Sequence, residues 1–204
     1  MQEKFGALSL RARKLKRLVD VVLALLGLLI FSPLFLIIYL VVKMQDRGNA
    51  IFKQERVGYK GVPFMLYKFR SMRTDAEKDG KPLLFSNNDP RLTPIGGFLR
   101  KYHVDELPQL WNVLKGDMSF VGYRPERQFF IDQIMTINPD YELLYQIRPG
   151  LFSEATLYNG YTDTIEKMIQ RLKMDLAYFS KQSFWFDMKI IFLTAIYLVS
   201  GKRN

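Results

Sequence analysis

Residues 18–42 form a continuous apolar segment, LVDVVLALLGLLIFSPLFLIIYLVV, in which Asp20 is the one charged residue. As a single helix these 25 residues would reach roughly 37 Å, which exceeds the ~30 Å hydrocarbon core of a bilayer. The segment is too long for the core of a signal peptide, and no small-residue cleavage site follows it. It therefore predicts a membrane segment; the alternative is a fully buried core helix of a soluble protein.

A helix break at Ser32-Pro33 divides this segment. Pro33 has no N–H to donate and clashes with the preceding turn, and it biases Ser32 away from the helical conformation. The two arms would reach roughly 21 and 14 Å, so neither spans a bilayer alone. We expect the Ser32 hydroxyl to satisfy a backbone group that the break frees.

Basic residues flank the apolar segment on both sides. Because Lys and Arg mark the cytoplasmic side, a re-entrant hairpin would keep both clusters in the cytoplasm, against anionic lipid headgroups. A spanning helix with a proline kink would place one cluster on the wrong side, but such kinks are common, and the sequence pattern leaves both topologies open. The flanking residues are Lys4, Arg11, Arg13, Lys14, Lys16 and Arg17 before the segment, and Lys43, Arg47, Lys53 and Arg56 after it.

Composition excludes several kinds of site. The 204 residues suit one domain and contain no cysteine, which rules out disulfides, thiolate metal centres and a cysteine nucleophile. His103 is the one histidine, so a His-rich metal site is excluded. The net charge of +10 predicts an anionic partner, such as nucleic acid, phosphates or an anionic membrane. Neither a P-loop nor a dinucleotide-binding glycine motif is present.

The chain after the apolar segment has the composition of a soluble domain. Two strands are predicted at Ile51–Val57 and Pro63–Phe69, joined by a turn at residues 58–61. Residues 74–92, which include Gly80 and Asn87-Asn88, are predicted to form a loop, and short helices are expected at 97–102, 108–114 and 126–137. A turn is expected at 148–150. Residues 164–179 predict an amphipathic helix, and 184–199 a more apolar one that lies at a membrane interface or in the core.

Charged residues gather between positions 89 and 126. Carboxylates interleaved with arginines suit a metal–diphosphate site, because carboxylates bind Mg²⁺ and guanidinium groups bind phosphate oxygens in pairs. Asp105 and Glu106 precede Leu107-Pro108, so they are expected at or near a helix start, where anions are favoured. An acidic pair at a helix start also occurs without catalysis, and composition alone favours that simpler interpretation. The members are Asp89, Arg91, Arg100, Lys101, His103, Asp105, Glu106, Lys115, Asp117, Arg124 and Glu126.

The run RKYHVDELPQLWNVLKGDMSFVGYRPE, residues 100–126, closely resembles the signature of bacterial sugar transferases, the monotopic phosphoglycosyl transferases. The resemblance continues at FKQERVG (52–58), YKFRSM (67–72), Asp89-Pro90-Arg91, Arg148-Pro149-Gly150 and the tail at 178–194. It implies an α+β, mostly helical monotopic membrane protein, with a re-entrant helix broken at Ser32-Pro33, a small β-hairpin and amphipathic C-terminal helices at the interface. Residues 1–43 would form the basic N-terminus and membrane helix, and 44–204 the cytoplasmic catalytic domain at the bacterial inner membrane.

The resemblance also implies an activity: transfer of a phospho-sugar from a UDP-sugar to a polyprenol phosphate, usually undecaprenyl phosphate, with release of UMP, which initiates surface glycoconjugate synthesis. The family's acidic dyad falls on Asp105 and Glu106, with Asp105 as the nucleophile that forms a phosphosugar intermediate. Both are candidates to hold Mg²⁺, and the resemblance leaves open whether Glu106 helps to hold the metal or positions the acceptor. Arg100 and Arg124 match family arginines near the phosphates. Lys68, Arg70 and Arg91 are weaker candidates for phosphate or nucleotide contacts.

The chain departs from the family pattern at two places. Tyr123 stands where the family often has proline, which predicts looser placement of Arg124, and residues 151–157 differ in a stretch that we associate with sugar recognition. His103 is expected to be a packing or pH-tuning residue. The competing hypotheses are an inactive membrane-anchored scaffold and a membrane-tethered nucleic-acid binder. The basic charge fits lipid headgroups and diphosphate better than nucleic acid, and the sequence leaves a homo-oligomer open.

Overall fold

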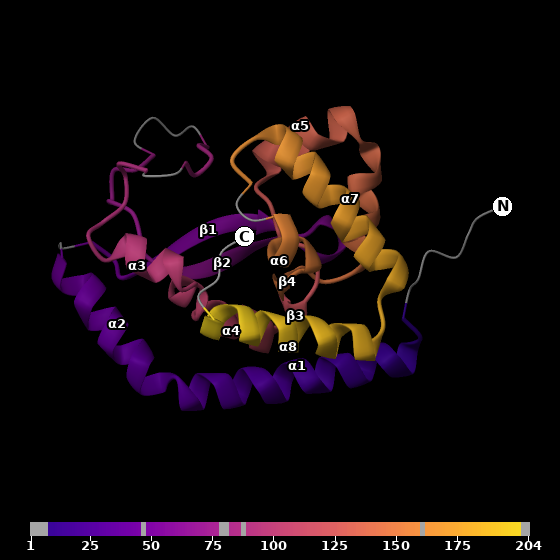
Figure 1. Cartoon of the computed structure of the whole chain (residues 1–204), viewed down its shortest axis with the longest axis horizontal. Coiled ribbons are helices and arrows are strands. Elements are labelled where there is room, and N and C mark those ends of the chain that lie inside the picture. Colours follow the sequence, from indigo (N-terminus) through magenta and orange to yellow (C-terminus); the bar gives the residue numbers. More distant parts are fainter. Residues whose placement is uncertain (1–7, 46–47, 78–81, 87–88, 160–161, 201–204) are drawn as a thin grey trace.

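Two helices at the start of the chain form a bent arm, and the remaining elements pack along one side of it (Figure 1). The computed structural model describes residues 8–45, 48–77, 82–86, 89–159 and 162–200. Lys4 and Arg47 of the predicted basic flanks, and Gly80 and Asn87-Asn88 of the predicted loop, lie outside these residues. The architecture is α+β and mostly helical, as predicted.

The arm consists of α1 (Leu10–Ile30) and α2 (Ser32–Gln45), which meet at 63°. Pro33 cannot donate to the carbonyl of Leu29, and the Ser32 hydroxyl donates to that oxygen instead, at 2.8 Å. The predicted break and the predicted role of Ser32 are confirmed. Within the described residues no single helix has the length and apolarity to cross a membrane, whereas the bent pair meets both conditions when taken together.

The predicted hairpin is present at the predicted residues. Strand β1 (Ile51–Val57) pairs antiparallel with β2 (Pro63–Phe69), with Ile51 opposite Phe69 and Val57 opposite Pro63. A short 3₁₀ turn, η1 (Tyr59–Gly61), joins them. Strand β2 contacts α4, where the Asn112 side chain donates to the carbonyl of Met65 at 2.7 Å and accepts from the Tyr67 N–H at 3.1 Å.

Short elements follow the hairpin. The helices α3 (Gly96–Lys101), α4 (Gln109–Lys115) and α5 (Gln128–Ile137) agree with prediction to within two residues at each end. The sequence did not predict the 3₁₀ segment η3 (Pro139–Gln146), the helix α6 (Glu154–Asn159) or a parallel pair of three-residue strands. These strands are β3 (Ser119–Val121) and β4 (Gly150–Phe152).

Glycine allows the chain to pack closely beside this strand pair. A Cβ atom on Gly122 would lie 2.3 Å from the carbonyl oxygen of Arg148, and one on Gly150 would lie 2.1 Å from the Gly122 nitrogen. No larger residue fits at either position without moving the backbone. The predicted turn at 148–150 therefore leads directly into β4.

The two C-terminal helices bury different surfaces. Helix α7 (Ile165–Lys181) is amphipathic, as predicted, and buries Met168, Leu172 and Phe179 in the same cluster as residues of α5. Helix α8 (Phe184–Ser200) lies beside α1 (Figure 1) and buries Ile190, while Trp185 on it stays exposed. Helix α8 therefore packs on one side and is exposed on another, and its position at a membrane interface stays a prediction.

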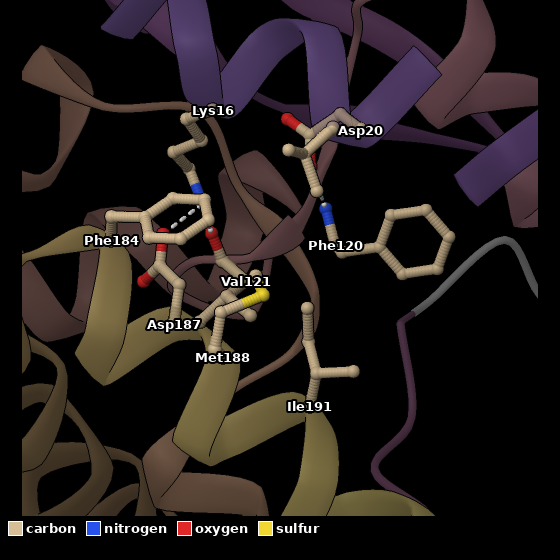
Figure 2. A pocket seen from close by; sticks show the side chains of 9 residues that line it. Lys16, Asp20, Phe120, Val121, Phe184, Asp187, Met188 and Ile191 are labelled. Atoms are coloured by element: carbon tan, nitrogen blue, oxygen red, sulfur yellow. Dashed lines mark hydrogen bonds and ion pairs between the residues drawn. The ribbon is translucent and has the colours of Figure 1, made fainter. Parts of the chain in front are cut away.

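Polar side chains attach α1 to the rest of the protein. Arg17 donates to the carbonyls of Val113 and Leu114 at the end of α4, at 2.6 and 2.8 Å. Lys16 forms an ion pair with Asp187 of α8, at 2.5 Å, beside a small pocket between α1 and α8 (Figure 2). The expectation that Lys16 and Arg17 face lipid headgroups is therefore wrong, because both are partly buried and bound to protein atoms.

Candidate active site

The predicted acidic pair lies in a 3₁₀ turn, η2 (Val104–Glu106), just before α4. His103 precedes the turn in the left-handed conformation, with φ of 54°, and so reverses the chain between α3 and η2. The side chain of Asp105 is buried, and that of Glu106 is nearly so. The expectation that the pair sits near a helix start is confirmed.

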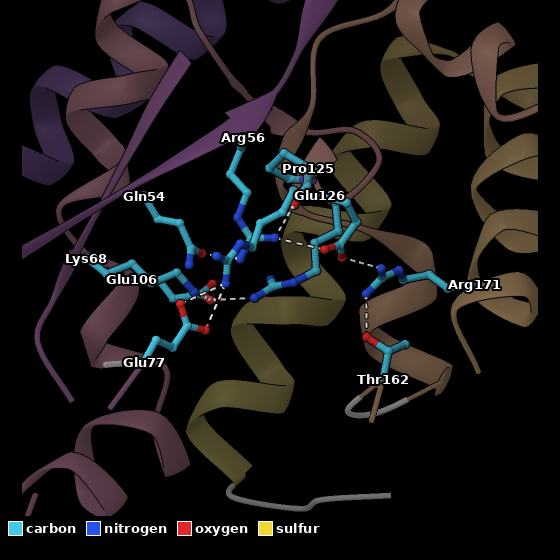
Figure 3. Close-up of polar contacts among 11 residues, drawn as sticks. Gln54, Arg56, Lys68, Glu77, Glu106, Pro125, Glu126, Thr162 and Arg171 are labelled. Carbon is cyan, nitrogen blue, oxygen red and sulfur yellow. Dashed lines mark hydrogen bonds and ion pairs between the residues drawn. The ribbon is translucent and has the colours of Figure 1, made fainter. Parts of the chain in front are cut away.

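Two cations from different elements hold Glu106 in place. Lys68 Nζ, on β2, lies 2.6 Å from Glu106 Oε1 (Figure 3). Arg124 Nη2 lies 3.1 Å from the same oxygen. Burial on its own would raise the pKa of Glu106, but Lys68, Arg124 and His103 hold that pKa well below its usual range. Glu106 is therefore a fixed carboxylate at neutral pH, and His103 helps to tune it, as predicted.

Asp105 differs from its neighbour in its contacts. Among the residues that the structure describes, none donates a hydrogen bond to the Asp105 carboxylate. Burial raises its pKa to about 6 against the opposing charge of Lys68, and the negative charge of Glu106 adds to the rise. The site thus holds one carboxylate fixed and leaves the adjacent one available to react.

Arg100 completes the group of cations around the pair. It lies in the last turn of α3, and its positive charge, like that of Arg124, lowers the pKa of Asp105. Its guanidinium carbon lies 3.8 Å from the centroid of the Phe85 ring. The structure therefore brings three of the five predicted cations, Lys68, Arg100 and Arg124, to the acidic pair.

The other two predicted cations have different partners. Arg70 is buried and donates to the carbonyl of Val42 near the end of α2, at 3.2 Å. Arg91 pairs with Asp89 at 2.5 Å and also donates to the carbonyl of Leu84, at 3.0 Å. In this structure Arg70 joins the arm to the hairpin, and Arg91 organises its own loop.

A buried ionic network that the sequence did not predict lies beside the site (Figure 3). Glu126 pairs with Arg56 of β1 at 2.8 Å and with Arg171 of α7. Arg171 also donates to Thr162. The expectation that Arg56 faces lipid headgroups is wrong. Its partner lies 70 positions away, and no local pattern reveals a pair of that separation.

Tyr123 is anchored by the core. Its side chain is fully buried in a cluster with Ile131 and Ile134, and its carbonyl accepts from the Gly150 N–H at 2.8 Å. The prediction that Tyr123 loosens the placement of Arg124 is therefore wrong.

The acidic pair fits a divalent cation that is shared with a substrate. Among the described residues, no group of three or more carboxylate or histidine side chains is placed to hold a metal on its own. Mg²⁺ commonly takes only one or two carboxylates and fills its remaining positions with water and substrate phosphates. Asp105, which accepts no hydrogen bond from the part of the chain that the structure describes, and the adjacent Glu106 suit that arrangement.

A buried acidic pair beneath three cations is suited to a phosphate-bearing substrate. A family model described as bacterial sugar transferase matches residues 11–201, and the chain belongs to that family. It is 45% identical over 184 residues to UDP-glucose:undecaprenyl-phosphate glucose-1-phosphate transferase of Escherichia coli K12, covering 89% of this chain and 39% of that protein. The chain thus spans about two fifths of that relative.

The relatives do not all have the same sugar in their names. A Caulobacter vibrioides protein named UDP-glucose:undecaprenyl-phosphate glucose-1-phosphate transferase is 41% identical, over 88% of this chain and 67% of its own length. An Aeromonas hydrophila protein, named UDP-N-acetylgalactosamine-undecaprenyl-phosphate N-acetylgalactosaminephosphotransferase, is 36% identical, over 92% of this chain and 44% of its own length. Sequence identity at this level therefore does not single out one sugar.

Proposed function

We propose that this protein is a phosphoglycosyl transferase that moves a sugar phosphate from a UDP-sugar to a polyprenol phosphate and releases UMP. The observation that carries the proposal is the contrast within the acidic pair. Glu106 is fixed by Lys68 and Arg124, whereas the Asp105 carboxylate is buried, free of hydrogen bonds from the described residues and surrounded by cations. Membership in the bacterial sugar transferase family supports the same conclusion.

The reaction follows in two displacements at phosphorus. An oxygen of the Asp105 carboxylate attacks the β-phosphorus of the UDP-sugar, the bond to the bridging oxygen breaks, and UMP leaves with that electron pair. The result is a sugar phosphate joined to Asp105 as an acyl phosphate. A phosphate oxygen of the polyprenol phosphate then attacks the same phosphorus. The acyl phosphate bond breaks, the carboxylate is restored, and the product is a polyprenol diphosphate sugar.

The surrounding residues give this carboxylate its reactivity. Lys68, Arg100 and Arg124 place positive charge where the donor phosphates would lie, and so reduce the repulsion between Asp105 and the diphosphate. Glu106, held by Lys68 and Arg124, keeps both cations oriented toward the reacting phosphate. Mg²⁺ bound by Asp105 and Glu106 would neutralise further charge on the diphosphate.

We also propose that the arm is a re-entrant membrane anchor on the cytoplasmic face of the inner membrane. Long apolar side chains on both helices face solvent: Leu29 near the bend is 72% exposed, and Met44 at the end of α2 is 83% exposed. Burying such side chains in lipid is favourable. Arg11, Arg13 and Lys14 are exposed cations at the start of α1 and would contact anionic headgroups.

Labelling of introduced cysteines tests this topology, because the chain has none of its own. We expect cysteines at positions 11 and 43 to resist an impermeant reagent added outside intact cells and to react after the membrane is permeabilised. Labelling of either position from outside would contradict the hairpin.

Release of UMP from a panel of UDP-sugars tests the activity. Protein in detergent with Mg²⁺ and undecaprenyl phosphate should release UMP from at least one UDP-hexose, and Asp105→Asn should abolish this release. UMP formation by Asp105→Asn at the wild-type rate would overturn the assigned mechanism. No UMP from any donor would instead favour an inactive scaffold. The panel would also identify the sugar.

A further inference from the structure

Two side chains of α1 hold the strand that leads to the active site. Asp20 is buried, and its Oδ1 atom accepts from the Ser119 hydroxyl at 3.1 Å and from the Phe120 N–H at 3.0 Å. One helical turn earlier, Lys16 Nζ donates to the carbonyl of Val121 at 3.0 Å. All three residues of β3 are therefore hydrogen-bonded to the apolar arm, across about 100 positions of sequence. Figure 2 shows Phe120 and Val121 beside Asp20 and Lys16.

Lys16 is itself held in place by residues of the two C-terminal helices. Asp187 of α8 pairs with Lys16 through Oδ2 and accepts from the Tyr178 hydroxyl of α7 through Oδ1, at 2.6 Å. The ion pair with Asp187 therefore keeps the Lys16 ammonium group next to the carbonyl of Val121. The result is a buried polar cluster that joins α1, β3 and both C-terminal helices.

Strand β3 connects this cluster to Arg124. Immediately after Val121, the Gly122 N–H donates to the carbonyl of Phe152 at 3.1 Å, and the carbonyl of Tyr123 accepts from Gly150 at 2.8 Å. The next residue is Arg124, whose guanidinium binds Glu106. Val121, Gly122 and Tyr123, the residues between Phe120 and Arg124, each make a hydrogen bond of their own, so the short stretch that joins β3 to Arg124 is held along its length.

We propose that Asp20 and Lys16 are positioning residues for the transferase, which hold β3 so that the Arg124 guanidinium stays on Glu106. This inference rests on the phosphoglycosyl transfer proposed above. It gives α1 a second role besides anchoring: the helix that enters the membrane also sets the geometry of the active site. An arm that is not seated on the domain would leave Arg124 misplaced, so catalysis would depend on the seating of the arm.

Kinetics of Asp20 variants test the proposal in the full-length protein. Asp20→Ala removes both hydrogen bonds to β3, and we expect kcat/KM for UMP release to fall by about 10- to 100-fold, the size expected for a small displacement of a positioned group. Asp20→Asn keeps an oxygen that can accept both bonds and should restore most of the activity. Ser119→Ala removes one bond and should have a smaller effect in the same direction.

Two controls separate positioning from a general loss of stability. Met168→Ala removes buried apolar contacts on α7 without touching β3, and should lower the melting temperature with little effect on kcat/KM. In an Arg124→Ala background, Asp20→Ala should cause little further loss, because the group that it positions is already absent. Equal losses of activity in the presence and absence of Arg124 would overturn the proposal.

A measurement that does not depend on catalysis distinguishes this inference from the proposed function. In ¹⁵N-arginine NMR spectra, the Arg124 side-chain signal, assigned by its loss in Arg124→Lys, should shift or broaden in Asp20→Ala and not in Met168→Ala. An unchanged Arg124 signal in folded Asp20→Ala would refute the positioning role. If the wild type releases no UMP, the proposed function fails, and this spectrum still decides whether Asp20 positions Arg124. Should Asp20→Ala not fold, Ser119→Ala gives the same comparison.

Discussion

The Glu126 network allows a sharp prediction about stability. Glu126 neutralises two guanidinium groups, from Arg56 and Arg171, and its side chain is only 6% exposed. Glu126→Gln keeps the size of the side chain but removes this counter-ion from the buried Arg171 and the partly buried Arg56. Breaking a buried ion pair by removing one partner typically costs about 3–5 kcal/mol of unfolding free energy. For a chain of this length each kcal/mol corresponds to roughly 2–4 °C, so the melting temperature should fall by about 6–20 °C.

A pair whose carboxylate is more accessible to solvent gives the control in the same protein. Arg127 and Glu77 form an ion pair at 2.8 Å, but their side chains are 20% and 31% exposed. Pairs near the surface contribute roughly 0–1 kcal/mol, so Glu77→Gln should shift the melting temperature by less than about 4 °C. Both variants can be measured by circular dichroism in the same detergent at pH 7. A shift for Glu126→Gln no larger than that for Glu77→Gln would refute the reasoning.

Three further predictions concern the reaction and the arm. Because burial raises the pKa of Asp105 to about 6 and only the charged form attacks, kcat/KM should rise with pH through about 6; a flat profile from pH 5 to 7 would contradict this. Lys68→Met removes the cation that most lowers the pKa of Asp105, so the rise of kcat/KM with pH should move to higher pH, and kcat/KM at pH 7 should fall on the order of 10²-fold. A rise of kcat/KM at the same pH as in the wild type would contradict the role of Lys68 in setting the pKa of Asp105. Pro33→Ala restores a donor for the Leu29 carbonyl, so spin labels on α1 and α2 should move apart as the 63° bend relaxes, and an unchanged distance would show that packing sets the bend.

Local chemistry made much of the fold predictable. The hairpin follows from alternating strand residues around a glycine-containing turn, and the break at Ser32-Pro33 from the missing N–H of proline. The acidic pair and two of its arginines were found because they lie within one continuous run, residues 100–126. For the hairpin and the helix break, neighbouring residues along the chain hold the information needed; the acidic pair was assigned through the resemblance of residues 100–126 to the family signature.

Contacts between distant segments were not predictable in the same way. Lys16, Arg17 and Arg56 were assigned to lipid headgroups because they flank an apolar segment, yet each binds a group roughly 70–170 positions away. Charge and spacing reveal that such residues need an anionic or carbonyl partner, but not which one. The strands β3 and β4 were missed because three residues are too few to show the alternation of apolar and polar side chains that marks a strand.

The most direct test of the central claim is the intact mass of the protein after reaction with the donor alone. Without polyprenol phosphate, wild-type protein incubated with its UDP-sugar and Mg²⁺ should gain the mass of one sugar phosphate, and UMP should appear in equal amount. The added mass should map to Asp105, and addition of polyprenol phosphate should remove it. Asp105→Asn should gain no mass. Turnover by wild-type protein with no sugar-phosphate adduct detectable on rapid quenching, or the same mass gain in Asp105→Asn, would contradict the account.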